Sequence, residues 1–513
     1  MRPARIQVAI LLWVSSGALL AAQVLTTQYD NARTGAVLNE TALTPSTVDA
    51  GRFGRVFTYR VDGDVYAQPL YVPHLEIPGK GAHDVVFVAT EHDSVYAFDA
   101  AGRSTEPLWH VNFLDPSKGI TALSSSDTQC PFIAPEIGIT PTPAIDLRTG
   151  TMYVLARTKR TGGANRTASY VQQLYALAIA TGAETSGGPI DIQASGFDPL
   201  RELPRAGLLL DRGHLYLTWA SSCDVGPYHG WVMTYDASTL EQTATLNVSP
   251  GGSEGGIWQS DNGPAADASG HVYVATGNGT FSAATGGRDY GDSLLKLSTS
   301  DGRLHVDDFF TPPDQARLSD QDLDLGSGGP MVVADPNVRD GSLILVGGKD
   351  GRLRVVDAAH LGRGAATALQ TIAFRGGIYS AAAYWNGRVY MLAGNDAIKA
   401  FAVSKGPLPL QPVDAGTQVF PNPGATPAIS ANGSRDGIVW IVQTKVWNEY
   451  GDRPAVLHAY DALHLTRELY SSEMNGGRDR AGAATRFAIP TIAGGRVYVG
   501  TRGEVDVYGA ITR

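Results

Sequence analysis

Short apolar runs separated by turn residues recur along the whole chain, and many of them carry an aromatic residue shortly before an aspartate. One clear copy is VFVATEHDSVYAFDAAG at Val86–Gly102, and the last is RVYVGTRGEVDVYGA at Arg496–Ala510. Each copy reads as β-strands joined by a tight turn. Eight copies at a spacing of roughly 40–65 residues are typical of a β-propeller, in which each copy is one four-stranded blade.

The repeats place eight blades along the chain, with seven blades as the main alternative. The first strand, Arg55–Val61, has no partner nearby, and the last repeat has material for only about three strands. We expect this N-terminal strand to pair with the last blade, which closes the ring and hides both sheet edges. The predicted blades are Ala67–His110, Gly138–Gly182, Gly207–Leu246, Gly256–Phe310, Gly328–Ile372, Gly377–Pro409, Ala425–Tyr470 and Phe487–Gly509.

Three connections between repeats are unusually long: Asn112–Glu136, Ser249–Asn262 and Phe309–Gly329. Connections of this length in a compact fold are more often functional than filler. All three join or precede blades, so we expect them to border the same mouth of the central channel.

The N-terminus has the layout of a secretory signal peptide. Arg2 and Arg5 precede an uncharged apolar stretch that ends at Ala22. This stretch is short and terminal, which favours a cleaved signal over a membrane span, with an uncleaved anchor as the alternative. We therefore divide the chain into a signal peptide (1–22), an N-terminal lead-in (23–54) and a single propeller domain (55–513), and we expect a periplasmic or secreted protein.

Charge and cysteine content narrow the range of partners. The chain has 40 Lys and Arg against 50 Asp and Glu, a formal net charge of −10 at pH 7, and signal removal makes it more acidic. Such a surface repels nucleic acid and anionic lipid, and no membrane span remains after signal removal. Cys130 and Cys223 are the two cysteines, which fits an exported protein with at most one disulfide; two buried thiols are the alternative.

Several segments together resemble the pyrroloquinoline-quinone (PQQ) dependent alcohol dehydrogenases. The opening QYDNARTGAVLNETALTPSTVDAGRFGRVFTYRVDG, then YAQPLYV and VVFVATEHDSVYAFDAAG, is similar to the start of that family. Its repeat ends in a tryptophan after an aspartate–glycine turn, as Asp99 and Trp109 do here. The resemblance covers most of the chain and implies an eight-bladed propeller. The same repeat also occurs in propellers without a cofactor, such as a scaffold of outer-membrane protein assembly, so fold alone does not fix function.

The resemblance implies a cofactor and metal site. In SEGGIWQS, Trp258 matches the tryptophan on which the quinone lies, and in VYVATGNGTF, Asn278 matches a Ca²⁺ ligand. In SSCDVGPYHGWVMTYD, Asp224 takes the place of a glutamate ligand, one methylene shorter. In GGKDGRLRVVD, Lys349 matches the cation that contacts the quinone. Each residue also has a simpler interpretation: a core or rim tryptophan, turn residues at Asn278 and Lys349, and a rim carboxylate at Asp224.

The catalytic base of the family lies in a Trp-Asp-x-x-Gly run in the loop after the fourth blade. Here that loop reads TPPDQARLSDQDLDLGSGGP, which offers Asp322 and Asp324 as the base, with Asp322 also a candidate metal ligand. The tryptophan is missing and the glycine comes later. A solvated acidic loop is the alternative. Chemically, carboxylate and amide oxygens suit Ca²⁺, and a carboxylate beside that ion is able to take an alcohol proton.

The family also carries two adjacent cysteines beneath the quinone, whereas only Cys130 lies in the matching region. Cys223 adjoins Asp224, so a Cys130–Cys223 bridge across the channel mouth would replace the adjacent pair and contact the cofactor.

These features lead to three functional hypotheses. The first is an exported quinoprotein oxidoreductase that acts on an alcohol or sugar with PQQ and Ca²⁺. It would pass electrons to a separate acceptor, because the chain has no Cys-x-x-Cys-His haem-attachment motif. The second is a non-catalytic propeller of the same ancestry used for binding or assembly. The third and weaker one is an enzyme that acts on extracellular polysaccharide through carboxylates at the rim.

Overall fold

The chain folds almost entirely into β-strands. The computed structural model describes residues 22–162, 168–185, 187–336, 341–364, 367–405, 409–444 and 451–511. Of the signal peptide expected at 1–22, all but Ala22 lies outside these residues. Within the described part, helical elements are limited to α1 (Ser125–Thr128), α2 (Gln315–Asp320), α3 (Gly476–Asp479) and the 3-10 turns η1 (Pro116–Lys118), η2 (Gln259–Asp261), η3 (Ala283–Thr285) and η4 (Leu325–Ser327). The predicted all-β class is confirmed, and no helix in these ranges is long and apolar enough to cross a membrane.

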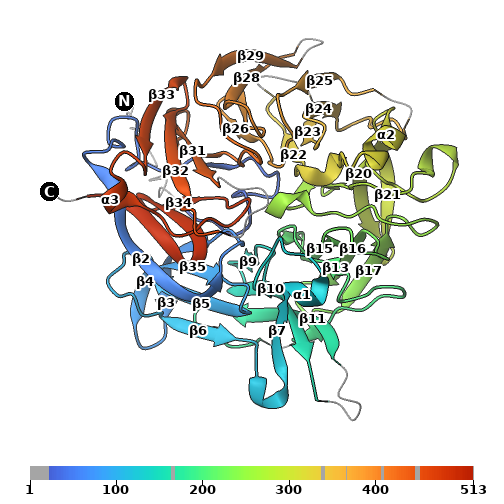
Figure 1. Cartoon of the computed structure of the whole chain (residues 1–513), viewed down its shortest axis with the longest axis horizontal. Helices are drawn as coiled ribbons and strands as arrows, with labels where there is room; N and C mark the ends of the chain where they lie inside the picture. The colour runs from blue at the N-terminus through green and yellow to red at the C-terminus, as the bar shows by residue number, and fades with distance from the viewer. Residues whose placement is uncertain are drawn as a thin grey trace, which may run out of the picture.

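The strands of the described residues form eight sheets, which lie around a common centre in the manner of a propeller (Figure 1). Four of the sheets each consist of four consecutive strands. They are β3 (Leu70–Ile77), β4 (Gly81–Ala89), β5 (Ser94–Asp99) and β6 (Trp109–Asn112); β18 (Ala265–Ala266), β19 (Val272–Ala275), β20 (Leu294–Ser300) and β21 (Arg303–Phe310); β22 (Met331–Val333), β23 (Leu343–Gly347), β24 (Arg352–Asp357) and β25 (Gln370–Ala373); β26 (Ala383–Trp385), β27 (Arg388–Met391), β28 (Lys399–Val403) and β29 (Leu410–Ala415).

The other four sheets carry additions or borrow a strand from the N-terminus. They are β7 (Ile120–Ser124), β8 (Glu136–Ile137), β9 (Ala144–Asp146), β10 (Thr151–Arg160), β11 (Ser169–Ala178) and β12 (Ile190–Asp191); β13 (Glu202–Leu203), β14 (Leu209–Asp211), β15 (His214–Ser221), β16 (Trp231–Asp236) and β17 (Gln242–Asn247); β1 (Ala36–Val37), β30 (Ala428–Asn432), β31 (Arg435–Gln443), β32 (Val456–Asp461) and β33 (His464–Ser471); β2 (Phe53–Asp64), β34 (Thr491–Ala493) and β35 (Arg496–Ala510).

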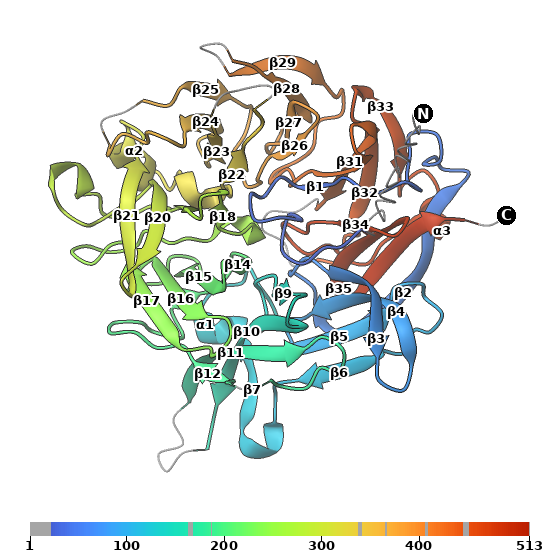
Figure 2. The ribbon, with the colours of Figure 1, turned by 180° about the vertical axis from the view of Figure 1, so that it is seen from behind.

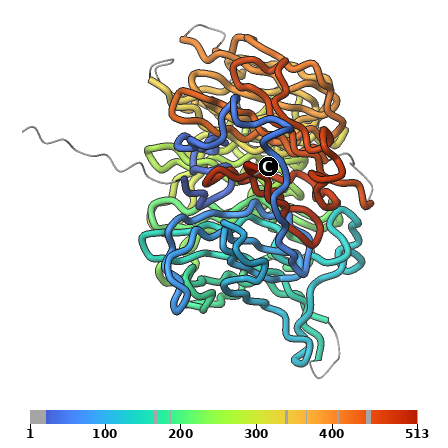
Figure 3. Tube along the Cα trace, turned by 90° about the vertical axis from the view of Figure 1, so that its left-hand side faces the viewer, coloured from blue at the N-terminus to red at the C-terminus, as the bar shows by residue number. Residues whose placement is uncertain are grey.

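The first long strand and the last one lie side by side. β2 pairs antiparallel with β35, with Phe53 opposite Ala510 and Tyr59 opposite Val505. Figure 3 shows the blue N-terminal strand against the red last sheet. This is the pairing that the sequence predicts for Arg55–Val61 and the last repeat.

Two predicted boundaries differ from the structure. The sixth predicted blade ends at Pro409, but β29 continues it over Leu410–Ala415. Most side chains of β29 are exposed, so this edge strand lacks the apolar alternation on which the prediction relied. The predicted loop Asn112–Glu136 contains β7, which pairs with the last three residues of β10 and so prolongs the second sheet.

The N-terminal lead-in runs through the middle of the molecule and contacts the innermost strand of every sheet in the described part (Figure 2). Its backbone carbonyls accept hydrogen bonds from the N–H groups of six of these strands, and Asn31 Nδ2 and the Tyr29 hydroxyl bond to backbone groups of the other two. The six backbone bonds are Tyr71 to Val24, Ile145 to Leu25, Ala266 to Asn31, Val332 to Ala32, Tyr384 to Thr34 and Ile429 to Gly35, at 2.6–2.9 Å. The lead-in thus satisfies inner sheet edges that would otherwise leave buried donors without partners.

Neighbouring sheets pack through large apolar side chains. Trp109, at the end of the first repeat, donates from its Nε1 to the carbonyl of Ile179 at 2.9 Å. Its ring lies over Gly182, where a Cβ would come within 2.6 Å of the indole. The tryptophan that follows the aspartate–glycine turn of this repeat therefore joins one sheet to the next.

Candidate functional site

A pocket opens where the three long connections meet. The first connection contributes Cys130 and Phe132, the second Trp258 and the third Asp324. The predicted convergence of these connections at one mouth is therefore observed. The other lining residues are Ile133, Ile137, Leu203, Arg205, Ala220, Ser221, Ser222, Cys223, Asp224, Tyr228, Gly256, Gly277, Lys349, Arg486 and Phe487.

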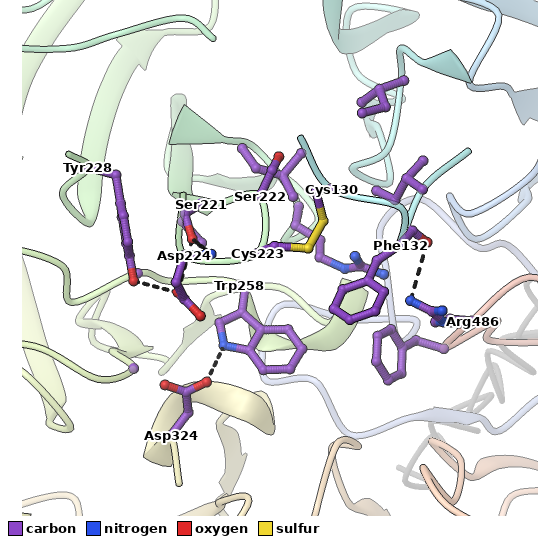
Figure 4. A pocket seen from close by; sticks show the side chains of 18 of the residues that line it. Cys130, Phe132, Ser221, Ser222, Cys223, Asp224, Tyr228, Trp258, Asp324 and Arg486 are labelled. Carbon is purple, nitrogen blue, oxygen red and sulfur yellow. Dashed lines mark hydrogen bonds between the residues drawn. A yellow bond between two sulfur atoms is a disulfide. The ribbon is translucent and has the colours of Figure 1, made fainter. Parts of the chain in front are cut away.

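A disulfide crosses one side of this pocket. Cys130 and Cys223 are bonded to each other, which joins the segment after α1 to the turn after β15 (Figure 4). The α1 segment is fixed in turn by Asp127, which accepts hydrogen bonds from Lys159 Nζ at 2.7 Å and from the Tyr170 hydroxyl at 3.0 Å. The disulfide is therefore part of a rigid pocket wall.

Trp258 lies at the centre of the pocket, bordered by Phe132 and the disulfide (Figure 4). The residues that follow it, Gln259, Ser260 and Asp261, all have positive φ, between 46° and 66°. A run of left-handed residues without glycine is costly, so the surrounding structure must hold this turn in place. The turn directs the indole Nε1 to Oδ2 of Asp324, at 3.2 Å.

Asp324 is the most constrained acid of the site. Its side chain is buried, its Oδ1 accepts from the backbone N–H of Asn278 at 2.7 Å, and its Oδ2 lies 2.7 Å from Lys349 Nζ. Burial holds the pKa of Asp324 above its usual value, although the nearby Lys349 charge and the Asn278 N–H oppose the shift. With three donors on two oxygens, the carboxylate retains acceptor capacity for one more group.

Lys349 lies between the two aspartates named as candidate bases. Its Nζ contacts both Asp324 and Asp322 and lies 5.5 Å from the ring centroid of Trp258. Burial alone would lower the pKa of Lys349, but the two carboxylates raise it above the usual value, so the side chain stays protonated. Asp322 differs from Asp324, because its side chain is 64% exposed and it does not line the pocket.

Asn278 connects the two aspartates. Its Nδ2 donates to Asp322 Oδ1 at 2.8 Å, while its Oδ1 is buried without a hydrogen-bond partner among the described residues. Asp224 lines the pocket nearby and accepts from the Tyr228 hydroxyl at 2.7 Å. Within the described ranges no three His, Cys, Asp or Glu side chains converge as a metal site. The side-chain oxygen donors offered to a cation here include two pocket carboxylates and the Asn278 amide.

Glu254 adds to the negative charge at this end of the pocket. Burial raises its pKa, and the charges of Asp224, Asp324 and Asp322 raise it further. Carboxylates therefore gather here around a single lysine, an arrangement that attracts a cation. The sequence analysis did not select Glu254, although it lies in the same SEGGIWQS segment as Trp258.

The opposite end of the pocket carries guanidinium groups. Arg205 forms a buried ion pair with Asp261 at 2.7 Å and lies 4.9 Å from the ring centroid of Phe487. Arg486 donates to the carbonyl of Phe132 and lies 4.5 Å from that ring. In the view of Figure 4, Arg486 is on the right and Asp224 and Asp324 are on the left. The pocket thus has a cationic and a carboxylate end.

Three residues at the cationic end share a position that sequence reasoning missed. Arg205, Phe487 and Asp261 each lie four residues before an innermost strand, namely β14, β34 and β18. Tyr66 has the same position before β3, and its ring centroid lies 5.8 Å from Arg205. Alignment of the repeats on their inner strands would have identified this layer.

The structure brings most of the predicted site residues together. Cys130, Cys223, Asp224, Trp258, Asp324 and Lys349 all line the pocket. Asn278 and Asp322 do not line the pocket. They contact Asp324 and Lys349, which do. Their roles in catalysis, cofactor binding and metal binding stay predictions.

Comparison with known proteins gives structural relatives only. No protein-family model and no curated protein matches the chain. A quinohemoprotein alcohol dehydrogenase from Comamonas testosteroni is similar, with 16% identity, a TM-score of 0.61 and coverage of 96% of this chain and 81% of that one. One from Pseudomonas putida HK5 has 14% identity, a TM-score of 0.62 and the same coverage.

Two further solved structures are similar to this chain in fold. A europium-containing methanol dehydrogenase has 12% identity and a TM-score of 0.60, with coverage of 95% of this chain and 98% of that one. BamB from Moraxella catarrhalis has 13% identity and a TM-score of 0.50, with coverage of 89% and 97%. Identities this low establish a common fold and leave activity to the chemistry of the site. The resemblance to the PQQ-dependent dehydrogenases is therefore confirmed as a shared quinoprotein-like propeller fold.

Proposed function

We propose that this chain is an exported quinoprotein oxidoreductase that oxidises an alcohol or sugar. We also infer an eight-bladed ring closed by β2 in the last blade, formed as one domain over 55–513 after a lead-in (23–54) and a signal peptide (1–22). The observation that carries the proposal is the contact of Trp258, Asp324 and Lys349 in a pocket walled by a disulfide. The disulfide also supports an oxidising, periplasmic or extracellular location.

The pocket residues fit PQQ, a flat tricarboxylated quinone. Trp258 and the Cys130–Cys223 disulfide offer the broad surfaces that a flat ring system needs. Lys349 would face the quinone oxygens, and Arg205 and Arg486 at the other end would meet carboxylates. When bound, the quinone supplies the electron sink for the oxidation.

The carboxylate end fits a hard cation such as Ca²⁺ or, as in the europium-containing neighbour, a lanthanide. Asp224 and the partnerless Oδ1 of Asn278 would hold it, while the remaining acceptor site of Asp324 is left for the substrate. Carboxylate and amide oxygens are the donor types that such a cation prefers. The charges of the neighbouring acids raise the pKa of Glu254, and a positive ion would offset this repulsion.

The chain's own residues define how an alcohol would react. Asp324 is buried and has one acceptor site left, so it is the group placed to take the hydroxyl proton of a substrate in the pocket. The positive charge of Lys349 favours the ionised form of this carboxylate and opposes the burial that raises the pKa of Asp324. Asp322, with a mostly exposed side chain, orients Lys349 and Asn278.

The first experiment tests cofactor binding. Purified protein is titrated with PQQ in the presence of Ca²⁺ or Eu³⁺, and the quenching of tryptophan fluorescence and the Eu³⁺ luminescence are recorded. The Trp258→Phe variant should lose most of the quenching, whereas Trp109→Phe, outside the pocket, should keep it. Absence of PQQ and metal binding to the wild-type protein would refute the proposal.

The second experiment assigns the base. Reduction of a dye by primary alcohols and aldoses is measured for Asp324→Asn and Asp322→Asn. Loss of a positioned general base costs about 10²–10⁴-fold, so Asp324→Asn should lose at least about 100-fold in kcat. Asp322→Asn should lose much less, and the reverse ranking would move the base to Asp322.

The rival proposal is a non-catalytic scaffold. Two observations favour it: the similarity to BamB, and the lack of a convergent trio of metal-ligating side chains among the described residues. A protein that binds no PQQ but retains a folded pocket would support this alternative.

A further inference from the structure

Asp292 is a buried acid outside the pocket that the proposed chemistry does not use. It lies in the connection between β19 and β20 and is fully buried, with φ of +49°. Left-handed backbone at a residue other than glycine costs about 1 kcal/mol, so local contacts must hold it there. Its backbone N–H donates to the carbonyl of Gly277 at 2.8 Å.

The side chain of Asp292 reaches a different loop. Its Oδ1 accepts from the backbone N–H of Leu325 at 3.1 Å, and its Oδ2 faces Gln315 Nε2 at 3.4 Å. Gln315 Nε2 also donates to the carbonyl of Gly279 at 3.0 Å. Asp292 therefore ties the Gly277–Gly279 turn to the loop that contains α2 and η4.

These two segments carry Asn278 and Asp324. Two contacts of Asp292 are each one residue away from one of them, at Gly277 and at Leu325. The direct bond from Asn278 N–H to Asp324 Oδ1, at 2.7 Å, requires the turn and the loop to keep one relative position. Asp292 adds a link between them, beside the direct contacts of Gln315 and Ser319 with Gly279.

The choice of aspartate over asparagine has a chemical reason. Two N–H donors, from Leu325 and Gln315, approach the two oxygens of this side chain. A carboxylate accepts at both oxygens, whereas an amide would turn an NH₂ group towards one donor.

We propose that Asp292 is a positioning residue that sets Asp324 against Asn278 and so fixes the base for turnover. This inference rests on the proposed function. Asp292 does not line the pocket, so it acts through Leu325 and the loop and not on the substrate.

The test compares Asp292→Ala, Asp292→Asn and Asp308→Ala. Asp308 is a matched control, because it also accepts backbone N–H groups, from Leu361, Gly362 and Arg363, away from the pocket. All three proteins are assayed for melting temperature, PQQ affinity, kcat, KM and amide hydrogen exchange at Leu325. Asp292→Ala should lower kcat at least 10-fold with KM and PQQ affinity within 3-fold of wild type, and should speed exchange at Leu325.

The conservative variant separates positioning from general stability. Asp292→Asn keeps an oxygen for Leu325, so it should recover most of the lost kcat. Equal kcat in Asp292→Ala and Asp308→Ala, with unchanged exchange at Leu325, would overturn the inference. If the wild-type protein binds no PQQ, the proposed function fails, and exchange at Leu325 still decides whether Asp292 holds the loop.

Discussion

Gly277 and Asp324 approach so closely that a Cβ on Gly277 would lie 2.6 Å from Asp324 Oδ1. Gly277 has no positive φ, and the main conflict is with the carboxylate, since the next atom from another residue is the Gly256 carbonyl oxygen at 3.3 Å. The position therefore offers a way to move Asp324 with little effect on the surrounding sheet.

Gly277→Ala should displace Asp324 and weaken PQQ and metal binding by at least about 10-fold, while unfolding becomes easier by about 1–3 kcal/mol, as for other overpacked sites. Fluorescence titration and urea unfolding measure the two effects. Gly476→Ala is the control, because nothing lies within 4 Å of its added methyl group. Binding at wild-type strength in Gly277→Ala would contradict this arrangement.

Loss of the Cys130–Cys223 bond should destabilise the whole protein. The two cysteines are 93 residues apart, and closing a loop of this length stabilises the native state by about 4.6 kcal/mol in the chain-entropy account. The double variant Cys130→Ser/Cys223→Ser should therefore unfold at a lower urea concentration than the oxidised wild type. Wild-type protein treated with a reductant should behave like the double variant. Coincident transitions for the oxidised wild type and the double variant would show that the bond contributes nothing.

Stability should fall as pH rises because of Glu91. Burial raises its pKa to about 8, although the Gly138 N–H and the Thr140 hydroxyl favour the ionised form. The unfolded chain releases this proton near pH 4.3, whereas the native state keeps it up to about pH 8. The free energy of unfolding therefore falls progressively as pH rises across this range. Glu91→Gln removes the titrating group.

Glu91→Gln should melt close to wild type at pH 4 and above it at pH 9. Differential scanning calorimetry across this range measures the difference. Glu241→Gln, at an exposed glutamate, should follow the wild type throughout. A constant offset between Glu91→Gln and wild type at all pH values would rule out Glu91 as the source.

Among the residues of the lead-in, Arg33 should make a large contribution to the free energy of unfolding. It is fully buried, and its guanidinium donates to the carbonyls of Pro264 at 2.8 Å and Thr27 at 2.7 Å; burial lowers its pKa to about 10. Arg33→Met would leave these acceptors unpaired, at a cost of about 1–3 kcal/mol each. Thermal unfolding should show a large loss, in contrast to Arg52→Met at an exposed site.

Local sequence patterns predict part of the fold and some of the residues that line the pocket. The recurring apolar strands, many with an aromatic residue shortly before an aspartate, predict the propeller class, because they record which positions are buried. Trp258, Lys349 and Asp224 were found because each lies beside a turn with glycines and a recognisable neighbourhood.

Other residues could not be found in this way, because their importance arises from contacts between distant repeats. Arg205 becomes significant only when Asp261 and Phe487 arrive from other sheets. Asp322 and Asp324 are indistinguishable in sequence, and the fold alone buries one and exposes the other. The edge strand Leu410–Ala415 was missed because it buries no regular face.

The segment that bonds to all the inner strands has a consequence for how such a chain can change over time. Its carbonyls accept from six inner strands, and its Asn31 and Tyr29 side chains bond to the other two, so it acts as a template matched to this set of sheets. Duplication or loss of one repeat would leave a carbonyl without its donor, or a strand without its acceptor. Insertion or deletion of a whole repeat is therefore disfavoured in this chain. Sequence changes are tolerated more easily in the long connections around the mouth, where they can alter specificity.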